Sequence, residues 1–145
     1  MVRFLTSLLV VLLCRPAPAG AWEWQVYGGN PGSSRYCPLK QINLTNAKNL
    51  KVHWTYRTGD SVERPATTIE CTPIVVRGVM YLTTAQMKVS ALDAATGKLL
   101  WTYDPFEGLD DDRPRGVSRG VTYWESGNDR RILSTFRALC VRASP

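Results

Sequence analysis

Four cysteines, one histidine and a short acidic run are the residues of this 145-residue sequence that could carry metal or redox chemistry. A single histidine cannot build a histidine-rich metal site, and the cysteines lie too far apart for the paired spacing of zinc sites. Metal coordination also needs converging oxygens, which a run of aspartates on a loop does not supply. We therefore predict no metal site and expect the cysteines to be structural or incidental. The residues concerned are Cys14, Cys37, Cys71, Cys140, His53, Asp110, Asp111 and Asp112.

The first 21 residues have the three parts of a secretory signal peptide. Arg3 provides the charged start, an apolar run extends from residue 4 to residue 14, and Ala19-Gly20-Ala21 provides small residues for cleavage. The apolar run is too short to span a bilayer. A lipoprotein site at Cys14 is the weaker alternative, because Leu13 stands where such sites usually want a small residue. We expect export to the periplasm or beyond.

Composition excludes two broad classes of protein. With 44% hydrophobic residues, 21% charged residues and five tryptophans, the chain can build a core and is not intrinsically disordered. The formal net charge of +6 comes from lysines and arginines scattered along the chain. Because nucleic-acid binding proteins gather such charges on one face, this balance does not indicate a nucleic-acid partner.

Residues 22–50 are predicted to form an extended strap, because glycine, proline and serine are frequent in the first half of this segment. Asn43 or Thr45 could cap a short helical turn that follows. In residues 51–57, Val52, Trp54 and Tyr56 alternate with polar neighbours, which predicts a half-buried strand.

Four short strands are predicted between residues 73 and 103. Two of them flank Arg77-Gly78, and glycine suits the second position of a tight hairpin turn. The other two cover residues 89–93 and 98–103, on either side of a turn ending at Gly97. These four strands make one antiparallel meander. A sheet of this size cannot bury both faces by itself, so it must stack on copies of itself.

The sequence contains signs of such a copy. Trp54-Thr55-Tyr56 recurs as Trp101-Thr102-Tyr103, a spacing close to the length of one β-propeller blade. Residues 119–124 echo residues 77–82, and a further strand is predicted over residues 131–136. The fold class is therefore all-β, and the repeat favours a partial β-propeller with one complete blade and the start of a second. From the repeat alone, an ordinary β-sandwich remains an open alternative.

Five motifs, in order along residues 24–137, resemble the eight-bladed quinoprotein propellers, the alcohol and glucose dehydrogenases that use pyrroloquinoline quinone (PQQ). Residues 91–101 match the tryptophan-docking repeat A-x-D-x-x-T-G-x-x-x-W of that family. The opening of the chain, around Trp24 and Tyr27-Gly28-Gly29-Asn30, is similar to the family's opening. The other three motifs are Trp54-Thr55-Tyr56-Arg57-Thr58-Gly59-Asp60, Glu70-Cys71-Thr72-Pro73 and Arg119-Gly120-Val121.

The resemblance implies a PQQ-binding function, with calcium polarising the quinone carbonyl for oxidation of an alcohol or sugar. The glutamate and arginine of the last two motifs contact the cofactor in that family, so Glu70 and Arg119 become the candidate cofactor-binding residues. Arg119 would offer a charged fork to the anionic cofactor, while Glu70 would accept hydrogen bonds. The structural alternative is a solvated Glu70 and an Arg119 paired with the acidic run at 110–112. Trp101 is expected to pack one blade on the next.

The chain also departs from the family pattern. In the family that the chain resembles, several alcohol-oxidising members carry two adjacent cysteines where this chain has Arg113 and Pro114, which favours the glucose-dehydrogenase branch. Residues 138–145 are a divergent tail, which suggests truncation or a shifted reading frame after an incomplete propeller over residues 51–137. The family's calcium ligands and catalytic aspartate have no counterpart in the chain.

We therefore expect a fragment of a PQQ-dependent dehydrogenase that is inactive alone. The whole enzyme would act on an alcohol or sugar and pass electrons to a respiratory acceptor. A non-catalytic scaffold propeller that binds proteins and a degraded gene remnant are the alternatives.

Overall fold

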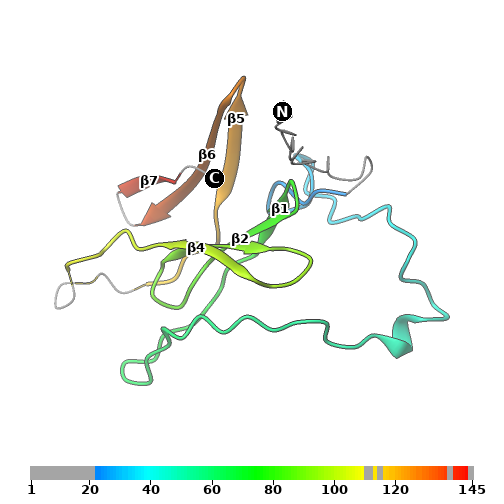
Figure 1. The fold of residues 1–145 in the computed structure, drawn as a ribbon, viewed down its shortest axis with the longest axis horizontal. Coiled ribbons are helices and arrows are strands. Elements are labelled where there is room, and N and C mark those ends of the chain that lie inside the picture. Colours follow the sequence, from blue (N-terminus) through cyan, green and yellow to red (C-terminus); the bar gives the residue numbers. More distant parts are fainter. Residues whose placement is uncertain (1–21, 110–112, 114–115, 137–138, 144–145) are drawn as a thin grey trace, which may run out of the picture.

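Two antiparallel sheets make up the computed structural model, which describes residues 22–109, 113, 116–136 and 139–143. The first sheet has the order β1-β2-β3-β4 and the second the order β5-β6-β7. Figure 1 shows the two sheets side by side, with the N-terminal strap running in a wide arc away from them. The predicted signal peptide, the acidic run at 110–112 and Pro114 lie outside the described residues. Within those residues, no helix is long and apolar enough to cross a membrane.

The first sheet is the predicted meander, and its strand bounds are Ile74–Val76 (β1), Val79–Thr83 (β2), Val89–Asp93 (β3) and Leu99–Tyr103 (β4). Arg77 and Gly78 both have positive φ, 52° and 78°, as a two-residue type I′ turn requires. The strands pair in register, with Tyr81 opposite Ile74 on one side and Ala91 on the other. A register shift between Ala91 and Leu92 is the one irregularity in the pairing of β3 with β4.

The second sheet consists of β5 (Thr122–Ser126), β6 (Asp129–Phe136) and β7 (Leu139–Ala143). The first two strands were expected from the sequence. The third is formed by most of the predicted divergent tail, which pairs antiparallel with β6 from Ile132↔Ala143 to Phe136↔Leu139. The tail therefore adds the next antiparallel strand to this sheet, and the blades of a β-propeller are built from successive antiparallel strands.

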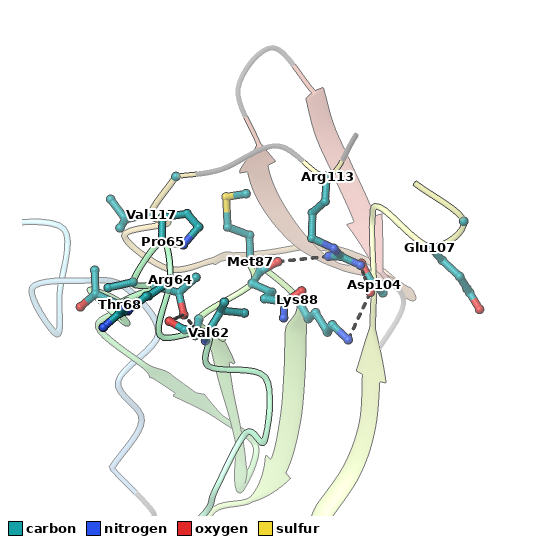
Figure 2. A pocket seen from close by; sticks show the side chains of 16 residues that line it. Val62, Arg64, Pro65, Thr68, Met87, Lys88, Asp104, Glu107, Arg113 and Val117 are labelled. Atoms are coloured by element: carbon teal, nitrogen blue, oxygen red, sulfur yellow. Dashed lines mark hydrogen bonds and ion pairs between the residues drawn. The ribbon is translucent and has the colours of Figure 1, made fainter. Parts of the chain in front are cut away.

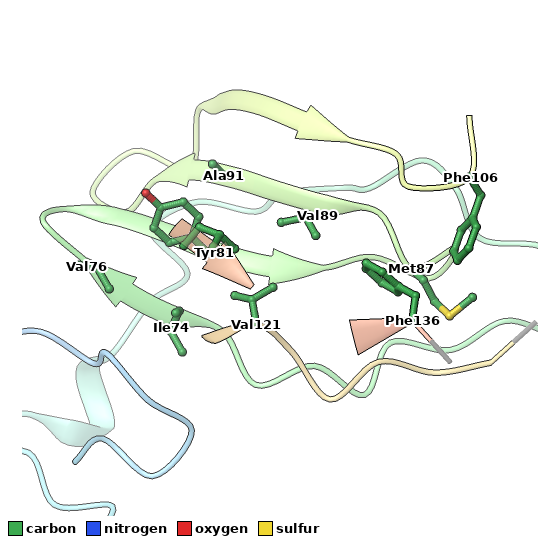
Figure 3. Packing of buried hydrophobic residues seen from close by; sticks show 10 residues of the cluster. Ile74, Val76, Tyr81, Met87, Val89, Ala91, Phe106, Val121 and Phe136 are labelled. Carbon is green, nitrogen blue, oxygen red and sulfur yellow. The ribbon is translucent and has the colours of Figure 1, made fainter. Parts of the chain in front are cut away.

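The core lies between the two sheets (Figure 3). Alternating residues of the first sheet point toward it, because successive side chains of a strand face opposite sides. Phe106 and Phe136 meet edge to face at one end, with ring centroids 5.6 Å apart. The buried cluster comprises Ile74, Val76, Tyr81, Met87, Val89, Ala91, Phe106, Val121, Ile132 and Phe136. Each sheet thus buries a face that it could not cover alone.

The strand prediction for residues 51–57 is wrong. This segment is extended but forms no ladder with the described strands, so its backbone is not part of either sheet. The predicted alternation is present only in part, since Trp54 and Tyr56 are half-buried between exposed neighbours but Val52 is exposed. Side chains hold the segment against the first sheet: the Tyr56 hydroxyl lies 3.5 Å from Ser90 Oγ of β3. Just after the segment, Asp60 Oδ2 accepts the backbone N–H of Gln86, in the turn between β2 and β3, at 3.2 Å.

The strap contains one helical turn, a 3-10 helix over Ala47–Asn49 (η1). Its N-cap is Asn46, which makes no side-chain capping bond, so the prediction of Asn43 or Thr45 as the cap is wrong. Asn43 Oδ1 instead accepts the backbone N–H of Thr45 at 2.9 Å, a local turn that competes with capping. Nearer its start, the strap joins the edge of the first sheet through paired Trp24–Val75 backbone hydrogen bonds of 2.9 Å.

Candidate cofactor-binding site

Glu70 and Arg119 lie in the two segments that lead into the first strands of the two sheets. We call residues 70–73 and 118–121 the lead-in segments; β1 follows the first of them and β5 the second. The structure brings the two candidate residues together: Arg119 Nη1 lies 2.9 Å from Glu70 Oε2. The carboxylate is 35% exposed and the guanidinium 80% exposed. Arg119 thus pairs with Glu70, and Asp110, Asp111 and Asp112 lie outside the described residues.

The backbones of the lead-in segments are also in contact. The Thr72 N–H donates to the Arg119 carbonyl at 3.2 Å. Gly120 has a φ of +130°, and a Cβ there would lie 2.9 Å from the Thr72 carbonyl oxygen. Glycine is required because a side chain would clash with the neighbouring backbone in a conformation that L-residues rarely adopt. The R-G-V motif therefore permits the close approach that places Arg119 beside Glu70.

This arrangement can bind an anion. A guanidinium carries five N–H donors in a rigid fork, and a single contact with Glu70 leaves others pointing to solvent. Glu70 fixes the orientation of the fork and can accept a hydrogen bond from a ligand. The described residues contain no group of three or more His, Cys, Asp and Glu side chains that could hold a metal ion. The exposed N–H groups of Arg119 can recognise a ligand with carboxylate or carbonyl oxygens.

An open cavity of about 800 Å³ is lined by residues that precede the two lead-in segments and by the turn between β2 and β3 (Figure 2); neither Glu70 nor Arg119 lines it. Thr68 and Val117, which come shortly before Glu70 and Arg119 in the chain, line it on one side. Asp104 lies on the other side, where Arg113 Nη2 approaches it at 2.6 Å and Lys88 Nζ at 3.3 Å. The cavity is lined by both charged and apolar side chains, and Thr68 and Val117 connect it along the chain to the lead-in segments.

Asp104 is the most strongly perturbed carboxyl group of this cavity. Partial burial alone would raise its pKa, but hydrogen bonds from Arg113, from the Phe106 N–H and from Lys88 outweigh burial and lower the pKa to about 2. The carboxylate therefore stays ionised and joins the turn after β2 to the segment after β4. Sequence reasoning missed this residue, because its only signal was an aspartate directly after a strand.

The tryptophan-docking repeat has a structural role. Asp93 Oδ1 accepts the Thr96 N–H at 2.8 Å and the Thr96 hydroxyl at 2.7 Å, which closes the turn after β3. Gly97 follows with a φ of +72° and packs against the Trp54 ring. A Cβ built at residue 97 would lie only 2.5 Å from atoms of that ring. Trp101 packs against the core cluster, and its ring centroid lies 6.0 Å from that of Tyr81 in the same sheet.

Of the other sequence candidates, Cys71 belongs to the first lead-in segment, whereas Cys37 and His53 lie in the strap and the extended segment. Cys37 is an exposed free thiol, and Cys71 is a half-buried free thiol beside Glu70. His53 is exposed on the extended segment. The side chain of Cys140 lies outside the described residues.

Comparison with known proteins identifies the family. The sequence model of the PQQ family described as glucose/ethanol/alcohol dehydrogenase, beta-propeller domain, matches residues 24–143. The chain is 43% identical over 114 residues to quinoprotein glucose dehydrogenase of Escherichia coli (strain K12), covering 76% of this chain and 14% of that protein. It is 47% identical over 117 residues to the dehydrogenase subunit of alcohol dehydrogenase (quinone) from Gluconobacter oxydans (strain 621H). That alignment covers 79% of this chain and 14% of the relative.

Solved structures give the same result. The quinohemoprotein alcohol dehydrogenase of Comamonas testosteroni superimposes with a TM-score of 0.69 at 28% identity, over 85% of this chain and 18% of that one. The quinohemoprotein alcohol dehydrogenase ADHIIG of Pseudomonas putida HK5 superimposes with a TM-score of 0.64 at 35% identity, over 78% of this chain and 16% of that one. The chain thus spans about one seventh of the length of its curated relatives. The predicted all-β partial propeller is confirmed, and the chain belongs to the β-propeller family of PQQ-dependent glucose and alcohol dehydrogenases.

Proposed function

We propose that this chain provides two cofactor contacts, Glu70 and Arg119, in a PQQ-dependent dehydrogenase that oxidises a hydroxyl group of an alcohol or a sugar. The observation that carries the proposal is the 2.9 Å pair of these two residues at the meeting point of the two sheets. PQQ carries three carboxylates and an ortho-quinone, and when bound it supplies the oxidising group. The exposed fork of Arg119 fits a carboxylate or quinone oxygen of this kind.

The residues of the chain would bind and orient the cofactor. Arg119 would donate to the anionic edge of PQQ while its contact with Glu70 keeps the guanidinium in place. Charged hydrogen bonds of this type stabilise oxygens that gain electron density on reduction. The neighbouring cavity, lined by Asp104, Lys88 and Arg113, would lie beside the cofactor and remain open to substrate.

We propose that the calcium ligands, the catalytic aspartate and the remaining blades belong to other parts of the full enzyme. The 145-residue chain alone is therefore expected to show no turnover. We also propose periplasmic localisation after cleavage of the signal peptide, and electron transfer to a respiratory acceptor. Arg113 and Pro114 at the place of the adjacent cysteines favour a glucose-type substrate, although both glucose and alcohol dehydrogenases are among the relatives.

Titration of the purified chain with PQQ, followed by quenching of tryptophan fluorescence, tests this function. We expect saturable binding of PQQ and at least tenfold weaker binding of citrate, a tricarboxylate without the quinone ring. Equal binding of both compounds, or binding of neither, would contradict the proposal. Dye-linked oxidation of glucose or ethanol by the chain alone would contradict the expectation that it is inactive.

A further inference from the structure

Thr83 is a buried residue that contacts both lead-in segments. It is the last residue of β2 and is 1% exposed. Its backbone N–H donates to Cys71 Sγ at 3.2 Å, and its hydroxyl donates to the Ser118 carbonyl at 3.4 Å. Cys71 follows Glu70 in the chain, and Ser118 precedes Arg119. One buried residue is therefore hydrogen-bonded to the immediate neighbours of both candidate cofactor contacts.

The position itself would suit an apolar residue. Thr83 shares a face of β2 with Tyr81, which belongs to the core cluster. A hydroxyl buried at such a place costs free energy unless it is hydrogen-bonded, and a valine of the same shape would avoid that cost. The hydroxyl is bonded to the Ser118 carbonyl, in the segment that carries Arg119. Its presence thus has a geometric consequence for the site.

The contacts form a closed circuit. Thr83 joins Cys71 on one side and Ser118 on the other, and the Thr72 N–H joins the two segments directly through the Arg119 carbonyl at 3.2 Å. Loss of one of these hydrogen bonds lets residues 118–121 move relative to residues 70–73. Because Glu70 and Arg119 are each next to a member of this circuit, such a movement changes their separation.

We propose that Thr83 is a positioning residue for cofactor binding: its hydroxyl sets the separation of the two lead-in segments and so keeps Arg119 beside Glu70. This inference rests on the proposed function. It assigns the affinity for PQQ partly to a residue that is too deeply buried to touch the cofactor.

The test compares Thr83→Val with Thr83→Ser in the full 145-residue chain. Valine keeps the shape and removes the donor, whereas serine restores it. Thr102→Val is the control: the Thr102 hydroxyl contacts Ser90 Oγ at 3.0 Å within the same sheet, on an exposed residue away from the lead-in segments. Two quantities are measured: hydrogen exchange of the Thr72 amide by NMR, and the dissociation constant for PQQ.

We expect Thr83→Val to speed exchange of the Thr72 amide and to weaken PQQ binding, each by about fivefold, the usual effect of one lost hydrogen bond. Thr83→Ser and Thr102→Val should stay near the wild type in both measurements. The Tyr81 amide, inside the ladder with β1, reports on the stability of the sheet and should exchange at the wild-type rate in all variants.

Two results would overturn the inference. One is an unchanged Thr72 exchange rate in Thr83→Val; the other is an equal acceleration at Thr72 and Tyr81, which would indicate a general loss of stability. Failure of the proposed function is distinguishable from both. In that case the wild type binds no PQQ, while the exchange rates still decide whether Thr83 holds the two segments together.

Discussion

Arg119 Nη1 lies 2.9 Å from Glu70 Oε2, and the two residues stand at equivalent places, each just before the first strand of its own sheet. In a propeller, the first strands of neighbouring sheets lie next to each other, so residues at their starts converge. The pair therefore follows from the stacking of two repeats. Since Arg119 is 80% exposed, the pair is available to a ligand.

Arg119→Gln should separate a binding role from a structural one. An exposed ion pair contributes about 0 to 1 kcal/mol to stability, so the free energy of unfolding should hardly change. Loss of the charged fork should weaken PQQ binding at least tenfold, and Arg119→Lys should give an intermediate loss because lysine keeps only the charge.

The control is Arg57→Gln, which removes one positive charge from an exposed position on the extended segment. It should leave the affinity for PQQ unchanged. Fluorescence titration gives the affinities and urea unfolding gives the stabilities. An equal effect of both substitutions would indicate general attraction of an anion by net charge, contrary to the assigned contact.

Gly97→Ala should destabilise the protein more than Gly78→Ala. Both glycines have positive φ, 72° and 78°, so the backbone strain of an alanine is similar, about 1 to 2 kcal/mol. A Cβ at residue 97 would lie 2.5 Å from the Trp54 ring, whereas a Cβ at residue 78 would meet nothing within 4 Å. The additional loss in Gly97→Ala measures the docking of Trp54.

Urea unfolding followed by circular dichroism gives the two free energies. Gly97→Ala should also change the tryptophan emission of the folded chain, since the Trp54 ring must move. Equal destabilisation by the two substitutions would mean that the extended segment does not dock on the first sheet in solution.

Much of the fold could be predicted because its signals are local. The Arg77-Gly78 turn and the Asp93–Gly97 turn each fix a hairpin from neighbouring residues alone, and the alternation of the strands fixes which side faces the core. The extended segment shows the limit of this reasoning. Trp54 and Tyr56 alternate as in a strand, but a strand also needs a hydrogen-bonded neighbour, which the pattern of one segment cannot reveal.

The site was only partly accessible from the sequence. Glu70 and Arg119 were found through family motifs, but their contact depends on how the second sheet stacks on the first. The roles of Thr83 and Asp104 depend on which loops meet at the end of the sheet. Neither residue lies in a motif, and a threonine at the end of a strand is ordinary on propensity grounds.

Phe136→Ala should destabilise the packing of the two sheets. Phe136 is the last residue of β6, 1% exposed, and it meets Phe106 from the segment after β4. Removing a buried aromatic ring typically costs about 3 to 5 kcal/mol. Trp124→Ala, at an exposed position in the same sheet, is the control and should cost less than about 1 kcal/mol. Comparable losses in urea unfolding would contradict the observed core.

The free energy of unfolding should depend on pH in the acid range because of Asp104. Its pKa in the folded chain is about 2, below the ordinary value of 3.8, so folding favours the ionised carboxylate. The resulting stabilisation, about 2 kcal/mol, is present above pH 4 and is lost as the pH falls from about 4 toward 2. The Asp104 side chain is 18% exposed, and its partners Arg113 and Lys88 are 16% and 30% exposed.

Asp104→Asn removes this titration. The difference in the free energy of unfolding between wild type and Asp104→Asn, measured in urea, should be largest near pH 6 and should shrink below pH 4. Arg113→Gln should weaken the same pH dependence, because Arg113 Nη2 lies 2.6 Å from the carboxylate. A difference that stays constant from pH 6 to pH 2 would show that the ion pairs of Asp104 do not form in solution.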